Sequence, residues 1–309
     1  MNLKGKDFIS LTDFSADEIL YLLNYAQELK EQTKNGVLTP VLKDKNLVLI
    51  FSKPSLRTRV SFEIGMKQLG GSSLTLKQDE INLGVRETIS DTARVLSRYA
   101  DCVMIRTFAH KDVEEFANYS SVPVINGLTD DSHPCQIMAD LLTIKEHFKT
   151  LKGLKLVYVG DGNNVANSLL AGCALVGVDV TIACPEGYEP MEKYFSFAKE
   201  AAKKSGAKVE IEHNPQKAVS GANIIYTDVW ASMGQETQAD ERKEIFKSYQ
   251  VNEELVAKAQ SNVIVLHCLP AHREEEITHN VIEKFADIIF EQAENRMHAQ
   301  KAIMAALVK

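Results

Sequence analysis

An apolar, strand-like run at 46–50 leads into residues that could bind an anion: Ser55, Arg57, Thr58 and Arg59. Ser55 is a typical helix-capping residue, and an apolar helical pattern follows it. A helix N-terminus offers unpaired N–H donors and the positive end of a dipole, and a guanidinium adds a planar fork of donors. This combination predicts a site for a multiply charged anion such as phosphate. The alternative interpretation is a capped surface helix with two solvated arginines.

Other predicted strands in the first half also end in cationic side chains. Arg106 follows the apolar run at 102–105, and His133 lies in the polar segment after the run at 122–125. In open α/β sheets, ligands bind at the carboxyl ends of the strands. We therefore expect Arg57, Arg106 and His133 to line one phosphate-binding edge of a sheet.

Strand ends in the second half carry acidic and small polar groups instead. Asp228 follows the run at 224–227, Cys268 follows the run at 263–267, and Asn167 lies in a predicted helix. An acidic group among small polar groups suits a cationic amine. Cys268 could be either a nucleophile or a buried structural cysteine.

Three other chemistries find little support in the sequence. Gly160 and Gly162 follow a predicted strand, but Val165 stands where a dinucleotide fingerprint has its third glycine. No Gly-Lys-Ser/Thr sequence follows a glycine-rich turn, so a P-loop is absent. His133 and Cys135 lack the spacing of metal ligands. We expect no cofactor and no bound metal.

The site residues at the strand ends depend on the strands and helices that carry them. Predicted strands and helices alternate along the chain. The alternation predicts an α/β fold with two doubly wound parallel sheets. The helix at 136–149 is expected to connect two domains, the segment 77–87 is expected to be a loop, and Thr12 or Asp13 is expected to cap the first helix. The predicted strands are 46–51, 73–76, 102–105, 122–125, 154–159, 179–184, 208–212, 224–227, 263–267 and 287–290. The other predicted helices are 12–34, 88–99, 111–118, 164–176, 190–205, 252–258, 279–286 and 294–308.

Length and composition narrow the class of protein. At 309 residues, the chain is long enough for two domains. The net charge of −7 argues against a general nucleic-acid binder. No apolar run reaches the length of a membrane span, and the N-terminal segment lacks the apolar core of a signal peptide. The five scattered cysteines fit reduced thiols, so we expect a cytoplasmic protein.

Four motifs occur in a fixed order along the chain: Ser55-x-Arg57-Thr58-Arg59, His133-Pro134-Cys135-Gln136, Asp228-x-x-x-Ser232-Met233-Gly234 and His267-Cys268-Leu269-Pro270. With these motifs, essentially the whole chain resembles the aspartate/ornithine carbamoyltransferase family. The first two motifs are shared across that family. The Ser-Met-Gly and His-Cys-Leu-Pro elements resemble its ornithine-specific branch in particular.

The resemblance implies a reaction and an architecture. The carbamoyl group of carbamoyl phosphate would pass to the δ-amine of L-ornithine, giving L-citrulline and phosphate, in arginine biosynthesis or in the arginine deiminase pathway. Residues 1–149, completed by a C-terminal helix at about 293–309, would bind carbamoyl phosphate, and residues 150–292 would bind ornithine. The active site would lie in the cleft between the two domains. The resemblance also implies a homotrimer that needs no cofactor.

The resemblance assigns roles to individual residues as well. Asn82 belongs to the loop that would reach into the neighbouring subunit's site, at a position where relatives often have Gln or His. Leu56 stands where many relatives have Thr, but its backbone N–H could still bind phosphate. The implied carbamoyl-phosphate ligands are Ser55, Leu56, Arg57, Thr58, Asn82, Arg106, His133, Gln136, Cys268, Leu269 and Arg296. The implied catalytic residues among them are Arg106, His133, Cys268 and Arg296. The implied ornithine ligands are Asn167, Asp228, Ser232 and Met233.

Two alternatives to this reaction stay open. The chain could carbamoylate another amine, such as putrescine. Asp228 with the Ser-Met-Gly motif argues against this, because an acceptor without an α-amino acid head has no use for that set. The chain could also be a catalytically silent paralogue with a regulatory role, although it carries every motif residue that the reaction is expected to need.

Overall fold

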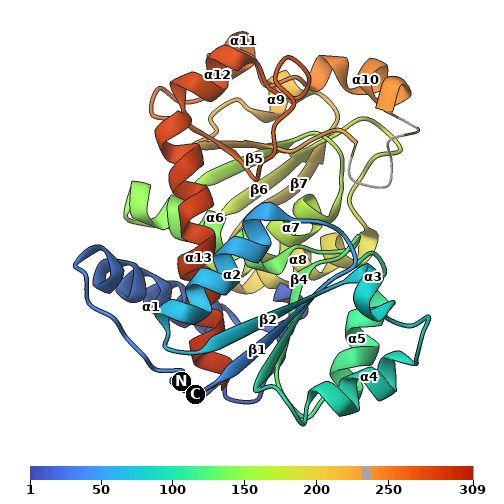
Figure 1. Ribbon diagram of the computed structural model, residues 1–309. Coiled ribbons are helices and arrows are strands. Elements are labelled where there is room, and N and C mark those ends of the chain that lie inside the picture. Colours follow the sequence, from blue (N-terminus) through green and yellow to red (C-terminus); the bar gives the residue numbers. More distant parts are fainter. Residues whose placement is uncertain (232–236, 238, 309) are drawn as a thin grey trace. The chain divides into compact units, whose positions relative to one another are not determined.

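The computed structural model describes residues 1–231, 237 and 239–308. The chain divides into two compact units, each with a parallel sheet and helices (Figure 1). Unit 1 comprises Met1–Leu142 and Glu294–Lys309, and unit 2 comprises Thr143–Ala293. The predicted α/β fold class with two parallel sheets is confirmed. The boundaries between the units fall inside two helices, α6 (Pro134–Phe148) and α13 (Ala286–Val308).

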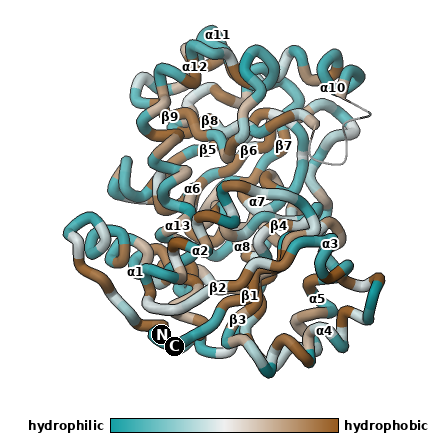
Figure 2. The backbone as a smooth tube through the Cα atoms, in the orientation of Figure 1, coloured by the Kyte–Doolittle hydropathy of each residue, from teal (hydrophilic) through white to brown (hydrophobic). Residues whose placement is uncertain are grey.

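In the described part of unit 1, four parallel strands lie in the order β2-β1-β3-β4. The central strands β1 and β3 are buried along almost their whole length, as expected inside a parallel sheet. The central strands β1 and β3 consist mainly of hydrophobic residues (Figure 2). The strands are β1 (Asn46–Phe51), β2 (Ser72–Lys77), β3 (Cys102–Arg106) and β4 (Val124–Leu128). The other helices are α1 (Ala16–Lys34), α2 (Leu56–Gln68), α3 (Gln78–Ile81), α4 (Ile89–Leu96) and α5 (His110–Tyr119).

In the described part of unit 2, five parallel strands lie in the order β7-β6-β5-β8-β9. Aliphatic residues of the strands pack with aromatic residues such as Trp230 and Phe246 in one buried core. The strands are β5 (Lys155–Val159), β6 (Asp179–Ala183), β7 (Val209–Glu212), β8 (Ile224–Thr227) and β9 (Ile264–His267). The helices are α7 (Asn164–Val176), α8 (Glu192–Ser205), α9 (Pro215–Ala218), α10 (Ala239–Phe246), α11 (Glu253–Val256) and α12 (His279–Lys284).

The start of the first helix was predicted wrongly. Thr12 and Asp13 lie in a separate short 3-10 helix, and α1 is capped by Ser15. The Ser15 hydroxyl accepts the backbone N–H of Glu18 at 3.3 Å, and the Glu18 carboxylate accepts the backbone N–H of Ser15 at 2.7 Å. This reciprocal capping box satisfies two donors at once, which explains why the helix begins there.

The predicted last strand at 287–290 is also wrong, because these residues belong to α13. The run Ile288-Ile289-Phe290 has a strand-like composition. Nevertheless, Ile289 is buried and its backbone N–H donates to the carbonyl of Phe285 at 3.0 Å, four residues earlier. The predicted loop at 77–87 likewise contains a short helix, α3.

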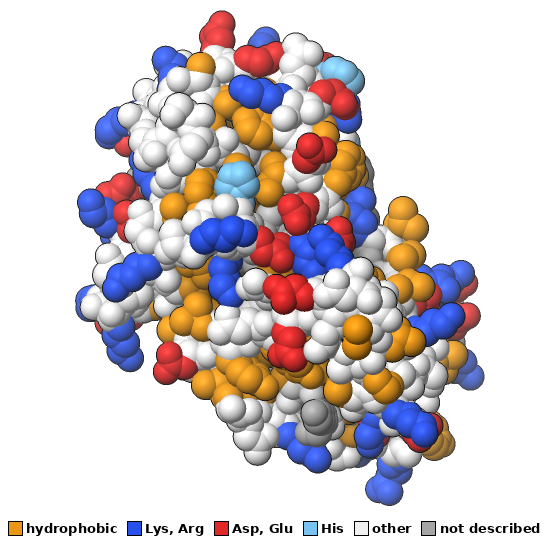
Figure 3. Space-filling model, turned by 90° about the vertical axis from the view of Figure 1, so that its left-hand side faces the viewer, with side chains coloured by type: hydrophobic (Ala, Val, Ile, Leu, Met, Phe, Trp, Pro, Cys, Tyr) orange, Lys and Arg blue, Asp and Glu red, His pale blue; other side chains and the backbone are white. Residues whose placement is uncertain are grey.

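The described surface charges, helices and cysteines show no unusual feature. Acidic and basic side chains are interspersed on the face drawn in Figure 3. Among the described helices, none has both the length and the hydrophobicity to cross a membrane. All five cysteines lie in the described part of the chain, where they are buried and no disulfide joins them.

Lys301 on α13 is a buried cation that ties three helices of unit 1 together. Its Nζ donates to Thr33 Oγ1 on α1 at 2.6 Å and to Gln68 Oε1 on α2 at 2.9 Å. Only 2% of the residue is exposed, and this burial lowers the pKa of Lys301 to about 8. The fold therefore disfavours the charged form of this amine, whose pKa is about 10.4 in an unfolded chain.

Between pH 8 and pH 10, we expect the free energy of unfolding to rise because of Lys301. In this window the unfolded chain holds a proton that the folded chain has released, so increasing pH favours the folded state by up to about 3 kcal/mol. Urea denaturation of the wild type and of Lys301→Met across this range measures the effect. The difference between the two proteins isolates Lys301 from other titrating groups, and equal pH slopes would refute the assignment.

Candidate functional site

The first group of predicted site residues lies where the strand order reverses in the sheet of unit 1. β1 and β3 are neighbours, with Phe51 paired to Arg106 at their carboxyl ends, although other elements separate them in the chain. Ser55 and Arg57 follow β1, and Arg106 is the last residue of β3. Reversal points of open parallel sheets are where ligands bind, so the fold alone favours this edge as a site.

The N-terminus of α2 has features that favour an anion. Ser55 caps the helix, and its hydroxyl accepts the backbone N–H of Thr58 at 3.3 Å. The first turn contains no acidic residue, and the half-buried Arg57 adds a guanidinium there. Leu56 is 76% exposed and its side chain has no polar atom, so only its backbone N–H is suited to bind an anion at this helix end.

Thr58 is the centre of a buried cluster of predicted site residues. Its Oγ1 accepts hydrogen bonds from Arg106 Nη1 at 3.2 Å and from Arg296 Nη2 at 2.6 Å. Arg296 belongs to α13, so the last helix of the chain completes this cluster in unit 1. Thr58, Arg106 and Arg296 are each at most 6% exposed. Two buried guanidinium groups beside one hydroxyl create a strongly positive environment for an anionic ligand.

His133 lies within reach of the same positive charges. Its pKa is well below the ordinary histidine value, chiefly because of burial and then because of Arg296, Arg106 and Arg57. The imidazole is therefore neutral around pH 7. A neutral imidazole can donate one N–H bond to a carbonyl oxygen without adding to the local charge.

Lys53 is a further cation of this site that the sequence interpretation missed. It is 4% exposed and forms a 2.7 Å ion pair with Asp130, and it contributes to the low pKa of His133. Its Nζ also lies 4.2 Å from the centre of the Phe108 ring. The signal in the sequence was its position two residues after β1, at the same strand end as Ser55.

Gln136 has a buried acceptor oxygen in unit 1, whereas the side chain of Asn82 is exposed. The Gln136 Nε2 donates to Asp140 Oδ1 at 2.8 Å, which fixes the orientation of the amide. Its Oε1 is buried and accepts no hydrogen bond from any residue that the structure describes. Asn82 ends α3 in a left-handed conformation with its side chain exposed, and no described contact joins it to the Thr58 cluster.

In unit 2, the strand order reverses between β5 and β8, and the acidic predicted residue lies there. Asp228 follows β8, and its Oδ1 accepts the S–H of Cys268 at 2.9 Å. Its Oδ2 accepts Nδ2 of Asn163 at 2.9 Å, and Asn163 follows β5. Asn163 was not predicted as a site residue. Its position at a strand end, as the cap of α7, was the available signal.

The glycine pair at this edge has a packing explanation. A Cβ on Gly162 would lie 2.3 Å from backbone atoms of Glu189 and Pro190, a distance at which backbone must move. Gly160 has a φ of +144°, a conformation that side chains rarely adopt. These constraints account for both glycines without a dinucleotide.

Among the remaining predicted ornithine ligands, Asn167 lies in the described part of the chain and two others do not. Asn167 is 1% exposed, and its Oδ1 accepts the backbone N–H of Met191 at 2.9 Å. Ser232 and Met233 lie outside the described residues. Leu269, a predicted carbamoyl-phosphate ligand, has a left-handed backbone with a φ of +58°, and its N–H donates to Nδ1 of His267 at 2.8 Å.

Asp228, His267 and Cys268 could in principle hold a metal, since their ligand atoms lie within 4.8 Å of one another. These atoms already have partners, however. Asp228 accepts from Cys268 and Asn163, and both ring nitrogens of His267 are hydrogen bonded. This group is therefore better described as a hydrogen-bonded cluster than as a metal centre.

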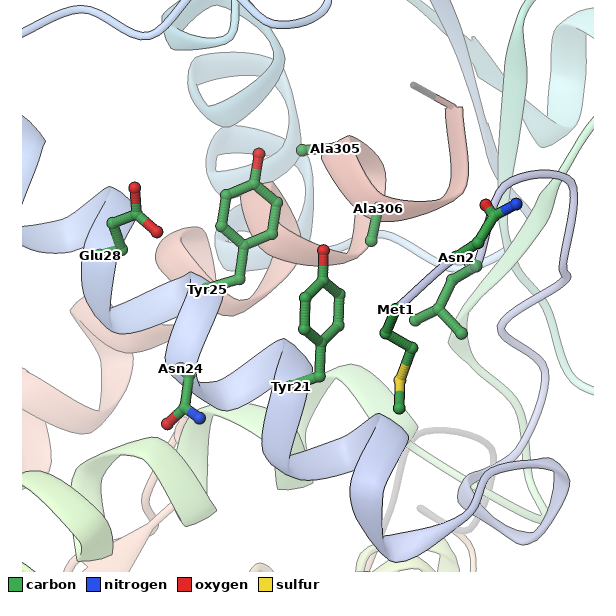
Figure 4. Close-up of a pocket in the computed structure, with 9 residues that line it drawn as sticks. Met1, Asn2, Tyr21, Asn24, Tyr25, Glu28, Ala305 and Ala306 are labelled. Atoms are coloured by element: carbon green, nitrogen blue, oxygen red, sulfur yellow. The ribbon is translucent and has the colours of Figure 1, made fainter.

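A surface pocket of about 470 Å³ lies elsewhere in unit 1 (Figure 4). It is bounded by the N-terminal segment, by Tyr21, Tyr25 and Glu28 of α1, and by the end of α13. The two tyrosine rings lie 6.2 Å apart between their centroids. None of the predicted site residues lines this pocket, so it is not part of the candidate site.

Comparison with known proteins gives full-length matches. A family model described as the carbamoyl-P binding domain of aspartate/ornithine carbamoyltransferase matches residues 6–146, and the model of its Asp/Orn binding domain matches residues 152–307. The chain is 54% identical to the ornithine carbamoyltransferase of Anoxybacillus flavithermus, covering 100% of this chain and 98% of that protein. The corresponding enzyme of Geobacillus stearothermophilus is 56% identical, with 100% and 99% covered. The solved ornithine carbamoyltransferase of Pyrococcus furiosus is 52% identical, with a TM-score of 0.97 and coverage of 100% and 98%.

Proposed function

Since the chain belongs to the aspartate/ornithine carbamoyltransferase family, we propose that it transfers a carbamoyl group from carbamoyl phosphate to L-ornithine. The products are L-citrulline and phosphate, which places the reaction in arginine metabolism. The observation that carries this proposal is the buried cluster in which Arg106 and Arg296 both donate to Thr58, beside the N-terminus of α2.

Carbamoyl phosphate binds to unit 1 in this proposal. The phosphate accepts hydrogen bonds from Ser55, Arg57, Thr58 and the backbone N–H of Leu56, at a helix end that attracts anions. Backbone N–H donors at a helix end together with a guanidinium suit a dianion better than a monoanion. Arg106 adds a second guanidinium from the neighbouring strand end.

The carbamoyl group is polarised by donors that surround its carbonyl oxygen. Arg106, neutral His133 and the Thr58 hydroxyl stabilise the negative charge that develops there, and each such donor is worth about 3 kcal/mol when water is excluded. Gln136 Oε1, which has no described donor, accepts from the carbamoyl amino group. Arg296 also contacts the carbamoyl group and completes this set.

Ornithine binds to unit 2. Asp228 holds its α-ammonium group, assisted by Asn167, Ser232 and Met233 around the amino acid head. Cys268 and the backbone carbonyl of Leu269 contact the reacting amine. The Cys268 thiol is positioned by its hydrogen bond to Asp228, which links binding of the amino acid head to the reacting end.

The chemical step is a direct attack that needs no covalent enzyme intermediate. The δ-amine must first lose a proton, since its pKa in solution resembles that of lysine, about 10. Burial beside arginines favours the neutral amine, which attacks the carbonyl carbon. The C–O bond to phosphate then breaks, phosphate leaves with the electron pair, and the attacking nitrogen loses its remaining extra proton. Holding both substrates in line contributes up to about 7–11 kcal/mol.

The reaction uses one substrate site in each unit. We therefore assign carbamoyl phosphate to residues 1–149 with the C-terminal helix at about 293–309, and ornithine to residues 150–292. We also place the protein in the cytoplasm, since its cysteines form no disulfide and fit a reducing compartment.

Self-association into a homotrimer is part of the proposal. Leu56, Val60 and Ile64 lie one turn apart on α2 and are 76%, 47% and 42% exposed, which leaves an apolar stripe without a described cover. Such a stripe is typical of an interface. In the trimer, Asn82 would reach the neighbouring site. Light scattering of the purified chain measures the mass, and a monomer at micromolar concentration would contradict the assembly.

Product formation with three acceptors tests the reaction itself. With carbamoyl phosphate present, we expect citrulline from ornithine. The kcat/KM for ornithine should be at least about 100-fold above that for putrescine, which lacks the α-carboxylate, or for aspartate, which lacks the δ-amine. Preference for putrescine would establish the other amine reaction. Turnover with none of the three would support the silent paralogue.

A further inference from the structure

A second group of potential metal ligands lies between β9 and α12 of unit 2, in residues that the proposed reaction does not use. One ring nitrogen of His272 and one carboxylate oxygen each of Glu275 and Glu276 lie within 4.8 Å of one another. Nδ1 of His272 is 3.7 Å from Oε2 of Glu275. Proximity of such groups is common at protein surfaces, but a fully buried glutamate such as Glu276 is rare.

Glu276 is fully buried, with 0% exposure, and its described partners are neutral donors. Its Oε1 accepts the backbone N–H of His272 at 2.6 Å and lies 3.0 Å from Nε2 of His267. The N–H of Leu269 donates to Nδ1 of His267, so that nitrogen carries a lone pair and the ring is neutral. His267 therefore offers Glu276 an N–H bond but no positive charge.

The second oxygen of Glu276 is the atom that needs explanation. Oε2 is buried and accepts no hydrogen bond from any described residue. A carboxylate removed from water is costly unless a cation or a full set of donors compensates it. The buried charge and the incomplete set of donors both favour a cation at this carboxylate.

Glu275 and His272 supply the solvent-facing side of the group. Oε1 of Glu275 pairs with Lys243 at 2.8 Å, which leaves Oε2 toward His272. The side chains of His272 and Glu275 are 52% and 32% exposed, so an ion can enter from solvent. The described charge partners of Lys243 are Glu275 and Asp240, so Lys243 balances the charge of Glu275 but not that of Glu276.

We propose that His272, Glu275 and Glu276 bind a divalent transition-metal ion of the Zn²⁺ class. One imidazole nitrogen and two carboxylate oxygens form a ligand set that Zn²⁺ accepts, with water in the fourth position. Ligands bound at about 2.1 Å in a tetrahedron are about 3.4 Å apart, which is close to the 3.7 Å between His272 and Glu275. Because Glu276 also contacts His267, the ion would stabilise the turn that follows Cys268.

Zinc binding to the metal-stripped full-length chain tests this site. Competition with a chromophoric chelator should show one saturable Zn²⁺ per chain in the wild type. The variants His272→Ala and Glu275→Gln should each weaken its affinity by about 10-fold or more, since each removes a ligand. His213→Ala is the matched control, because His213 is also partly exposed in unit 2 and lies 3.9 Å from Glu189. This control should bind Zn²⁺ as the wild type does.

Two results would overturn the proposal. The first is the absence of saturable binding in the wild type, or equal affinity in the wild type and His272→Ala. The second is loss of the ion in Cys268→Ser with retention in His272→Ala, which would assign it to the cluster of Asp228, His267 and Cys268. Circular dichroism confirms that each variant is folded. The measurement does not depend on citrulline formation, so it stands or fails separately from the proposed reaction.

Discussion

Replacing Arg57 by glutamine should lower kcat/KM for carbamoyl phosphate by about 10²- to 10³-fold while the fold persists. The half-buried guanidinium stands in the first turn of α2, beside the Ser55 cap and without an acidic neighbour in that turn. Glutamine keeps a polar side chain of helical propensity but loses the charge and the fork of donors. Steady-state kinetics and thermal unfolding of Arg57→Gln measure the two effects.

The same variant should change the pH dependence of the reaction. Arg57 is one of the cations that hold the pKa of His133 well below its ordinary value. Removing that charge raises the pKa of His133, so protonation begins at a higher pH. Because the proposed role of His133 requires the neutral ring, the acidic limb of the kcat/KM profile should move toward neutral pH.

Arg59→Gln is the matched control on the same helix. Arg59 is exposed and forms a 2.9 Å ion pair with Glu63, one turn along α2, which is worth less than about 1 kcal/mol. We expect its kcat/KM to remain within about 3-fold of the wild type, since the pair does not enter the site. Equal losses in both arginine variants would show that helix integrity, not phosphate binding, is affected.

The strand ends explain why so much of this site was predictable. Each buried strand appears in the sequence as an apolar run, and the polar residue that follows it, such as Arg106 or Asp228, lies at the edge where ligands bind. The motifs then assigned roles to these residues through the family resemblance. The reversal points in both sheets agree with that assignment, since strand order depends on the fold and not on the motifs.

Contacts between distant parts of the chain were harder to predict. Arg296 reaches Thr58 across 238 positions, and no local pattern in the sequence indicates that pairing. Lys53 and Asn163 were missed because an isolated lysine or asparagine at a strand end has no distinctive pattern. The wrong strand at 287–290 has a related cause: a β-branched run favours a strand locally, whereas the packing of a long helix decides its structure.

In unit 2, Asp228→Asn should lower kcat/KM for ornithine by about 10³-fold and leave binding of inorganic phosphate unchanged. The carboxylate accepts from Cys268 on one oxygen and from Asn163 on the other. An amide at this position places an NH₂ group opposite one of these two donors, so a hydrogen bond is lost together with the charge that would bind the α-ammonium group. Calorimetry with phosphate and kinetics with ornithine separate the two half-sites.

The loss of kcat/KM in Asp228→Asn should exceed the contribution of the hydrogen bond between Asn163 and Asp228 alone. Asn163→Ala removes one donor to Asp228 but keeps the carboxylate, so we expect a loss of only about 10-fold. If Asp228→Asn and Asn163→Ala lose the same activity, the aspartate acts by orienting its neighbours and not by binding a positive charge. If phosphate affinity falls with ornithine kcat/KM in Asp228→Asn, the substitution has disturbed unit 1 as well, and the division of labour between the units would be wrong.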